Sequence, residues 1–373
     1  MNLIFSFYLA LFCICTQLQA QTPPSCDKNK QMESLAVVGH ETTFMMKLLT
    51  VAKKKFKQVY FVPMRENLQN GNVFPVLPKG ITVFRGPDKF DQLLKENPQG
   101  IITFQFEYAE KLKALTTCEQ PKMIVLSSKT SVDQYEAMQP DLRKALSTIK
   151  IVSFWHSRLK TPDSYHGLGR SILKVFDSLH INKDQSVLLL GYGKTGKGIA
   201  HYLQQAGYHV GVYDIDPTEV VLALHDGLAV GSLHSLAKKA DVLIDATGDT
   251  SNVLTLESAN FFEKPKVYVV SSSTNDHGIS ILNGYQNSHG TIFTIDGSHG
   301  MINMYHKIGG SDDEAMRVTG YSLLYMMENY PAIIKDLAPI NHNLYQLSPA
   351  FEGKIAESFL KEPQLLGGPP IPQ

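Results

Sequence analysis

The sequence lacks an excess of charge of either sign. Its 35 Lys and Arg residues balance 35 Asp and Glu residues, so the formal net charge at pH 7 is +0. A protein whose main partner is a nucleic acid needs a basic excess to pair with phosphates. The composition therefore argues against that class of function.

Cysteine is scarce, with four residues in a chain of 373. No group of Cys and His residues has the spacing of a metal site, so we predict no metal. Removal of an N-terminal signal would take away Cys13 and Cys15 and leave Cys26 and Cys118. For this pair two interpretations stay open: one disulfide in an oxidising compartment, or two separate thiols.

Long apolar runs are also rare, and the exception stands at the N-terminus. Leu3–Cys15 is apolar at every position but one, and the first charged residue is Asp27. Such a run is too short to span a bilayer comfortably but is typical of a signal-peptide core, with Leu18–Ala20 as the cleavage site. We expect residues 1–20 to be a signal peptide and the protein to be secreted or periplasmic. The alternative is an N-terminal extension that is buried or unstructured, in a cytoplasmic protein.

The pattern around which the chain is organised is the stretch Ser186–Asp214. Ser186–Leu190 is a short apolar run typical of a buried strand. A glycine cluster with the spacing G-x-G-x-x-G follows, and then apolar residues recur at helical spacing as far as Gly207. His209–Tyr213 is a second strand, with Asp214 at its carboxyl end. This order of strand, glycine loop, helix, strand and acid predicts a dinucleotide site.

Each residue of this unit has a physical role in binding a dinucleotide. Gly191 allows the tight turn after the strand, Gly193 lets the backbone approach a pyrophosphate, and Gly196 lets helix and strand pack closely. The N–H groups at the start of the helix attract the phosphates. Asp214 would bind the ribose hydroxyls and repel a 2′-phosphate, which favours NAD over NADP. A strand–turn–helix that binds nothing is the alternative.

Short apolar runs alternate with helical stretches before this unit. The expected strands are Leu35–Val38, Gln58–Val62, Ile81–Phe84, Ile101–Phe104, Met123–Leu126 and Ile149–Phe154. The expected helices are Thr42–Phe56, Asp88–Glu96, Tyr108–Leu115 and Val132–Met138. This alternation predicts an α/β fold, with two Rossmann-like domains that have parallel sheets covered by helices.

The chain is expected to insert its NAD domain into a substrate-type domain. The predicted boundaries are 34–165 for the substrate-type domain, 166–300 for the NAD domain, 301–345 for a return segment that packs on the first domain, and 346–373 for a C-terminal tail. Within the NAD domain, Thr291–Ile295 is expected to be the last strand. The polar segment 155–167 is the expected hinge, and ligands tend to bind at such junctions.

The stretch from Gly191 to Leu224 resembles the NAD domain of S-adenosylhomocysteine hydrolases. The shared motifs are Gly191-Tyr192-Gly193, Gly196-Lys197-Gly198 and Asp214-Ile215-Asp216-Pro217. Thr247-Gly248 stands where this family has Thr-Gly at a strand end, and Met301–Met304 resembles its return segment, whose Asn contacts NAD. The resemblance implies NAD as cofactor. The cofactor-binding residues that we predict are Gly191, Gly193, Lys194, Thr195, Gly196, Lys197, Asp214, Thr247, Gly248 and Asn303.

The resemblance also implies a mechanism, from which the sequence departs. In the family, bound NAD oxidises the 3′-hydroxyl of the substrate's ribose, the thiol is eliminated, water adds, and NAD is regenerated. The carboxylate-bearing segments of the family correspond to Ile102–Phe106 and Leu126–Thr130, which contain no carboxylate. Its Gly-His-Phe-Asp loop is replaced by Ser272–His277, and its C-terminal Lys-Tyr tail is absent. Each lost acid/base group typically costs about 10²–10⁴ in rate.

Three candidate catalytic residues remain in the expected hinge. Lys160 corresponds to a family lysine, Asp163 to a substrate-contacting Asp if one residue has been deleted between them, and His156 titrates near neutrality. Ordinary loop charges and a structural histidine are the alternatives. Lys194 replaces an Asp common in the family, and it either touches a phosphate or points to water.

We therefore expect an NAD-dependent enzyme with an altered substrate or reaction. Its expected partners are NAD and a small, nucleoside-like molecule, with no nucleic acid and no stable membrane span. A non-catalytic NAD-binding or interaction protein and an ordinary dehydrogenase that releases NADH are the alternatives. A homo-oligomer is an open possibility.

Overall fold

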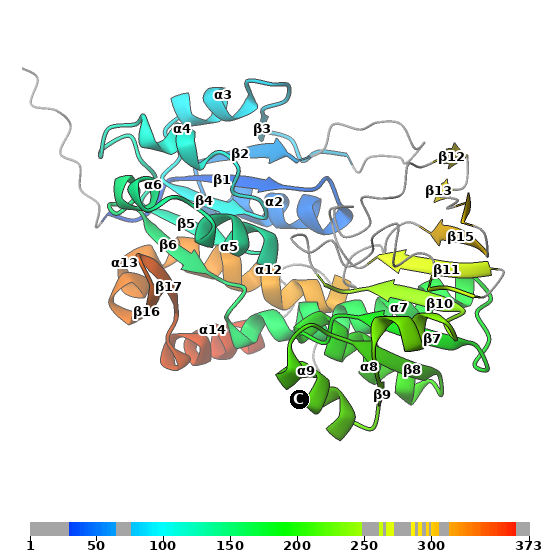
Figure 1. Ribbon diagram of the computed structural model, residues 1–373. Helices are drawn as coiled ribbons and strands as arrows, with labels where there is room; N and C mark the ends of the chain where they lie inside the picture. Colours follow the sequence, from blue (N-terminus) through cyan, green and yellow to red (C-terminus); the bar gives the residue numbers. More distant parts are fainter. Residues whose placement is uncertain are drawn as a thin grey trace, which may run out of the picture.

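The computed structural model contains two β-sheets with helices packed on them (Figure 1). The described residues are 30–64, 76–247 and 313–362, with the short stretches 261–263, 266–271, 285–287, 290–292, 296–297 and 300–305. The expected signal peptide, Cys26 and residues 363–373 lie outside them. Export and the disulfide therefore stay predictions. Cys118 lies on the surface.

The first sheet is almost entirely parallel. Its described strands are β1 (Ser34–Gly39), β2 (Gln58–Pro63), β3 (Thr82–Val83), β4 (Gly100–Thr103), β5 (Met123–Leu126), β6 (Lys150–Ser153), β16 (Leu337–Asn341) and β17 (Leu344–Leu347). They lie in the order β16-β17-β6-β5-β4-β1-β2-β3, and only β16 and β17 pair in antiparallel fashion. Strands β1, β4 and β5 are buried at every position, as expected for strands covered on both faces.

Helices cover both faces of this sheet. They are α2 (Thr43–Lys55), α3 (Lys89–Lys95), α4 (Ala109–Lys113), α5 (Lys129–Glu136), α6 (Pro140–Ala145), α12 (Asp313–Glu328), α13 (Tyr330–Ile333) and α14 (Pro349–Lys361), with the 3-10 turn η4 (Ile334–Asp336) after α13. Side chains cap the N-termini of α2, α5 and α14. Thr42, for example, precedes α2 and its hydroxyl accepts a hydrogen bond from the Met45 backbone N–H at 3.1 Å.

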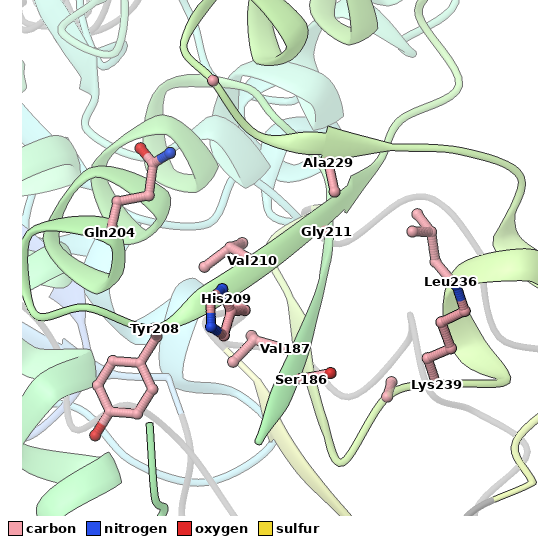
Figure 2. Close-up of a pocket in the computed structure, with 12 residues that line it drawn as sticks. Ser186, Val187, Gln204, Tyr208, His209, Val210, Gly211, Ala229, Leu236 and Lys239 are labelled. Atoms are coloured by element: carbon pink, nitrogen blue, oxygen red, sulfur yellow. The ribbon is translucent and has the colours of Figure 1, made fainter. Parts of the chain in front are cut away.

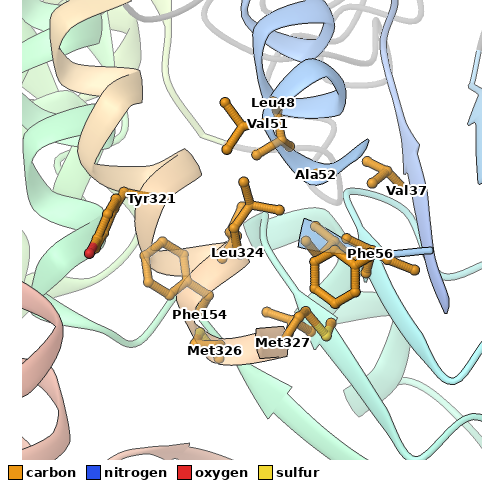
Figure 3. Packing of buried hydrophobic residues seen from close by; sticks show 14 of the residues in the cluster. Val37, Leu48, Val51, Ala52, Phe56, Phe154, Tyr321, Leu324, Met326 and Met327 are labelled. Atoms are coloured by element: carbon orange, nitrogen blue, oxygen red, sulfur yellow. The ribbon is translucent and has the colours of Figure 1, made fainter. Parts of the chain in front are cut away.

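Alternate residues of each strand contribute to two separate cores. Val37 of β1 belongs to the core beneath α2, α12 and α14, and its neighbour Val38 belongs to the core beneath α3, α4 and α5. Figure 3 shows the first of these cores, where Leu324 of α12 lies between Leu48 of α2 and Met327 of α12. The late helix α12 thus completes the core of a sheet that begins at residue 34.

The second sheet carries the glycine loop. Its described strands are β7 (Ser186–Leu190), β8 (His209–Tyr213), β9 (Ala229–Val230), β10 (Val242–Asp245), β11 (Lys266–Ser271), β14 (Asp296–Gly297) and β15 (Gly300–Tyr305). Their order is β14-β15-β11-β10-β7-β8-β9, with β14 antiparallel to β15 and the other pairs parallel. Strands β12 (Tyr285–Asn287) and β13 (Gly290–Ile292) form a separate antiparallel pair.

The chain crosses between the two sheets twice. The described helices of the second sheet lie between these crossings in the sequence. They are α7 (Leu168–Ser178), α8 (Lys194–Gln205), α9 (Pro217–His225) and α10 (Leu233–Ala237). From β6 the chain passes through the 3-10 turn η1 (Arg158–Lys160) and the π-helical turn η2 (Pro162–Gly167) into α7. Helix α12 makes the return crossing, and η2 packs against both α8 and α12. The structure therefore has an α/β fold with two parallel sheets, as the sequence predicts.

Three sequence predictions differ from the observed elements. Thr291–Ile295 is not the last strand, because β13 belongs to a separate pair and β15 follows it in the second sheet. Met301–Met304 is likewise part of β15 rather than a return segment, so the predicted boundary near residue 300 falls too early. The expected tail also contains the helix α14, which the first core buries through Phe351 and Ile355.

None of the described helices is both long and apolar enough to cross a membrane.

Candidate functional site

The glycine loop forms at the carboxyl end of β7. Gly191 has φ of +88°, a conformation that favours glycine, and a Cβ there would lie 2.8 Å from the Ala246 carbonyl oxygen. A Cβ on Gly196 would lie 2.0 Å from the Gly191 carbonyl oxygen. Both positions therefore require glycine for the turn and for the close approach of helix α8 to the strand.

Gly193 differs from Gly191 and Gly196 because the described residues leave room for a Cβ there. Apart from its two chain neighbours, no described residue would lie within 4 Å of that Cβ, and Gly193 is exposed at the N-terminus of α8. A bare backbone before a helix N-terminus, with room beside it, is the arrangement that accepts a pyrophosphate. The loop therefore fits the diphosphate of a dinucleotide.

Asp214 follows β8 and faces the same loop. Its Oδ2 accepts a hydrogen bond from the Tyr192 backbone N–H at 2.6 Å, and its Oδ1 accepts one from the Asp216 N–H at 2.9 Å. A carboxylate has about four acceptor positions, so two remain for ribose hydroxyls. The carboxylate is thus held beside the glycine loop, where NAD fits and a 2′-phosphate would be repelled.

The other predicted cofactor residues occupy varied positions. The Thr247 hydroxyl donates to Asp245 Oδ1 at 2.7 Å, at the end of the strand next to β7. The Lys197 ammonium forms an ion pair with Glu219 of α9 at 2.6 Å. Thr195 lies in the first turn of α8. Gly248 lies outside the described residues, and Asn303 pairs in register with Tyr268 of β11. Their roles toward NAD stay predictions.

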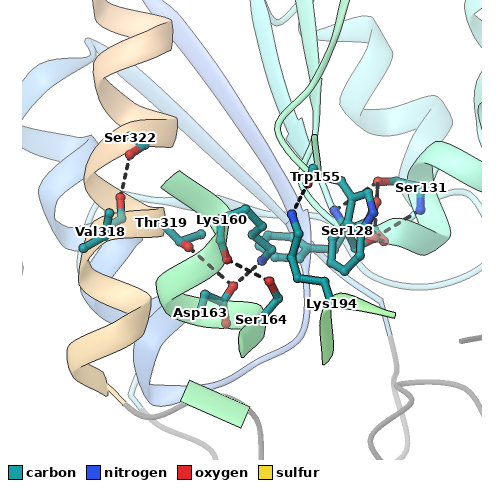
Figure 4. Close-up of polar contacts among 11 residues, drawn as sticks. Ser128, Ser131, Trp155, Lys160, Asp163, Ser164, Lys194, Val318, Thr319 and Ser322 are labelled. Carbon is teal, nitrogen blue, oxygen red and sulfur yellow. Dashed lines mark hydrogen bonds and ion pairs between the residues drawn. The ribbon is translucent and has the colours of Figure 1, made fainter. Parts of the chain in front are cut away.

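Lys194 points away from its own loop toward the first sheet. Its Nζ donates a hydrogen bond to the Trp155 carbonyl oxygen at 2.9 Å and lies 4.9 Å from the centroid of the Trp155 ring (Figure 4). Burial lowers the pKa of Lys194, and the positive charge of Lys160 lowers it further. The predicted contact of Lys194 with a phosphate stays a prediction.

Lys160 and Asp163 form a buried ion pair in the turns between the sheets. Their side chains are 8% and 6% exposed, and Lys160 Nζ bonds Asp163 Oδ2. Thr319 of α12 donates a hydrogen bond to the same oxygen at 3.4 Å, and the Ser164 hydroxyl donates to the Lys160 carbonyl at 2.9 Å (Figure 4). The sequence-predicted pair is therefore brought together where both crossings of the chain meet.

His156 lies between β6 and these turns. Its Nδ1 is 2.7 Å from the Ser153 hydroxyl oxygen, which fixes the ring. Burial lowers its pKa below the ordinary value of 6.5, Glu136 opposes that shift, and Lys194 adds to it. The imidazole is therefore neutral at neutral pH and able to take part in proton transfer.

Sequence reasoning missed Glu352 of α14. Its Oε1 accepts hydrogen bonds from the Ser157 hydroxyl at 2.8 Å and the Arg158 backbone N–H at 2.9 Å. Its Oε2 accepts one from Arg158 Nε at 2.7 Å. The carboxylate thus holds η1, the turn that contains Lys160. No local signal could have revealed this contact, because Glu352 lies 195 positions from Ser157 in the sequence.

A cavity of about 400 Å³ lies elsewhere on the second sheet. It is lined at the amino ends of β7 and β8, by Ser186 and His209 among others (Figure 2). Gly191 and Asp214 stand at the opposite, carboxyl ends of the same parallel strands. The chemistry expected of the glycine loop therefore does not involve this cavity. In the part of the chain that the structure describes, no group of three or more His, Cys, Asp or Glu side chains is placed to hold a metal ion.

The family match covers the part of the chain that carries the glycine loop. Residues 166–292 match the NAD binding domain of S-adenosyl-L-homocysteine hydrolase. The S-inosyl-L-homocysteine hydrolase of Methanothermobacter thermautotrophicus is 35% identical over 103 residues, which are 26% of this chain and 24% of that protein. The S-inosyl-L-homocysteine hydrolase of Methanopyrus kandleri is 25% identical over 186 residues, 48% of this chain and 42% of that protein. The matched stretches thus span less than half the length of these relatives.

A solved structure of similar fold is that of a dipicolinate synthase from Bacillus halodurans. It has a TM-score of 0.46 and 11% identity, over 79% of this chain and 98% of that protein. The sequence match coincides with the glycine loop and Asp214, whose geometry accepts NAD. NAD is therefore the cofactor, and residues 166–292 are similar to the NAD-binding domain of the S-adenosyl-L-homocysteine hydrolases.

Proposed function

We propose that the protein is an NAD-dependent enzyme whose substrate or reaction differs from hydrolysis of S-adenosylhomocysteine. The observation that supports this is the convergence of ionisable groups beside the glycine loop. Lys160 and Asp163 form a buried pair, and Lys194, the first residue of α8, lies close enough for Lys160 to lower its pKa. A buried ion pair is a weak source of stability, so its retention next to a cofactor site favours a chemical role.

The local hydrogen bonds of two hydroxyl groups in the first domain support the proposal of an altered reaction. The Thr103 hydroxyl at the end of β4 bonds the Gln105 carbonyl oxygen. The Ser128 hydroxyl bonds the Phe104 carbonyl at 2.6 Å and caps α5 by accepting from the Ser131 N–H at 3.1 Å. These positions correspond to carboxylate-bearing segments of the family, but here the side chains stabilise local structure. Several acid/base groups, each worth about 10²–10⁴ in rate, are therefore missing.

The candidate catalytic residues that remain have different roles because their environments differ. When bound, NAD supplies hydride transfer. Lys160 holds a proton near the junction and is oriented by Asp163, which Thr319 fixes from α12. His156 stays neutral and accepts or donates a proton at the ring nitrogen that Ser153 does not contact. These roles fit oxidation of a substrate hydroxyl, in which the hydride goes to NAD and the hydroxyl proton goes to a base.

A protein that retains NAD without chemistry is the second candidate. It is favoured by the fact that Lys160 and Asp163 already satisfy one another, as a structural pair would. The two candidates differ in one measurable property, because only an enzyme changes the redox state of its nucleotide when substrate is added.

The experiment starts with purified full-length protein. Released nucleotide is identified by mass spectrometry after denaturation, and NAD is expected. The NAD-loaded protein is then mixed with a panel of hydroxyl-bearing small molecules, and reduced nicotinamide is followed by its absorbance. Lys160→Met should abolish any reduction found, and Lys144→Met, at an exposed lysine, should not.

S-adenosylhomocysteine is included in the same panel. We expect no adenosine release from it, since the family carboxylates are missing. Adenosine release at the rate of a family enzyme would contradict the proposal of an altered reaction. Reduction that persists in Lys160→Met would contradict the role given to this lysine.

A further inference from the structure

Lys194 stands where three physical effects oppose a positive charge. It is the first residue of α8, at the end of the helix that itself carries partial positive charge. It is partly buried, and burial lowers its pKa. The ammonium of Lys160 is close enough to lower that pKa further. A cation held in such a place indicates that an anion is needed there.

The charges around Lys194 compensate its own charge only in part, because burial and Lys160 lower its pKa while Glu352 and Asp163 raise it. Lys160 is neutralised by Asp163, and Glu352 is paired with Arg158 at 2.7 Å. Among the described residues, no carboxylate forms an ion pair with Lys194, whose contacts are a carbonyl oxygen and an indole ring. Of these five described side chains, three are cations and two are carboxylates.

The side chain of Lys194 faces the first sheet. Lys194 reaches across to Trp155, which follows strand β6 of that sheet. Its ammonium thus belongs to the same junction as Lys160 and Asp163.

We infer that Lys194 binds a negatively charged oxygen group of the substrate, a carboxylate or a phosphate, beside Trp155. This rests on the proposed function, which it deepens by giving the substrate class. The anion would take the place of the Trp155 carbonyl as the acceptor of the Lys194 ammonium. The present acceptor is a neutral carbonyl, whereas an anionic acceptor would also balance the charge of the ammonium.

The chain supplies its own probe for the test, because Trp155 is the single tryptophan in the sequence. Tryptophan fluorescence therefore reports on the ring that Lys194 contacts. The full-length protein, with and without NAD, is titrated with sodium oxalate and with sodium phosphate. Sodium chloride at equal ionic strength serves as the blank. We expect a saturable change with at least one of the two oxyanions, in the presence of NAD.

Two variants test the residue. Lys194→Gln should weaken oxyanion binding by about ten- to a hundredfold, the value of one charged hydrogen bond. Lys89→Gln is the matched control, because Lys89 also begins a helix, donates to a carbonyl oxygen (Pro63, 3.0 Å) and lies over an aromatic ring (Phe90, 5.6 Å). It should leave binding unchanged. Lys194→Arg should retain most of the affinity, and thermal unfolding checks that each variant is folded.

The outcomes distinguish the sources of the anion. Oxyanion binding that persists with NAD bound supports the substrate site. Binding that occurs only without NAD and competes with it would mean that the pyrophosphate is the anion, and would overturn the inference. A change that follows ionic strength alone would overturn it as well. Absence of NAD from the purified protein would instead count against the proposed function, while the oxalate titration would still test Lys194.

Discussion

Substitution of two glycines in the same loop separates cofactor binding from folding. At Gly193 the backbone has φ −68° and ψ −167°, which alanine adopts freely, and an added Cβ would meet none of the described residues within 4 Å apart from its chain neighbours. At Gly196 the added Cβ would lie 2.0 Å from the carbonyl oxygen of Gly191. Alanine at Gly193 is therefore expected to weaken NAD binding, whereas alanine at Gly196 is expected to destabilise the fold.

The magnitudes follow from what each new methyl group meets. In Gly193→Ala the loss of a favourable helix cap and the reduced freedom of the unfolded chain nearly cancel, so stability changes by less than about 1 kcal/mol. The methyl group occupies space that the pyrophosphate approaches, which costs about 1–3 kcal/mol of binding, or about five- to 150-fold in affinity. In Gly196→Ala the backbone itself must move, which lowers the free energy of unfolding by about 1–3 kcal/mol.

Two measurements suffice for the pair. Thermal unfolding of nucleotide-free protein, followed by circular dichroism, gives the effect on folding. Calorimetric titration with NAD gives the effect on binding. The reasoning is refuted if Gly193→Ala binds NAD as tightly as the unchanged protein, or if Gly196→Ala unfolds at the unchanged temperature.

Three further predictions concern stability. Tyr192→Phe removes the hydrogen bond of a buried hydroxyl to a carboxylate at 2.6 Å and should lower the free energy of unfolding by about 1–2 kcal/mol in urea titrations. Glu352→Ala leaves the buried Ser157 hydroxyl without its acceptor and should lower the free energy of unfolding by about 2–4 kcal/mol. Glu357→Ala, at an exposed position of the same helix, should change it little. Equal effects would contradict the role given to Glu352 in holding η1. The lowered pKa of His156 means that the unfolded chain binds its proton more readily, so stability falls as the pH drops below 6.5 through the folded pKa; in His156→Gln, urea midpoints above and below pH 6.5 should differ less.

The sequence predicts local structure best where its signals are local. Strands β7 and β8 were expected at Ser186–Leu190 and His209–Tyr213, and they are observed there. A short apolar run, a glycine turn and a helical repeat all act within a few residues, so the pattern specifies the unit completely. Helix α14 and strand β17 gave no such signal, because their packing partners lie in the first half of the chain.

The candidate site shows the same limit. The sequence places Lys160 and Asp163 in the expected hinge, and the structure brings them together. The direction of Lys194 depends on Trp155, which reaches it from another sheet. The hold of Glu352 on η1 depends on the return of the chain. Contacts between segments far apart in sequence thus decide which charges face one another.

The double crossing of the chain has a consequence for biosynthesis. Strand β6 gains β17 as its neighbour, and the core beside Val37 gains Leu324, only after segments far along the sequence have been synthesised. In the meantime the nascent first sheet exposes an unpaired edge and an apolar face, whereas β7 finds its neighbour β8 within about thirty residues of the chain. The glycine-loop unit can therefore fold before the first sheet is complete. Completion of the first sheet then becomes the slow step of folding, at which chaperones would act.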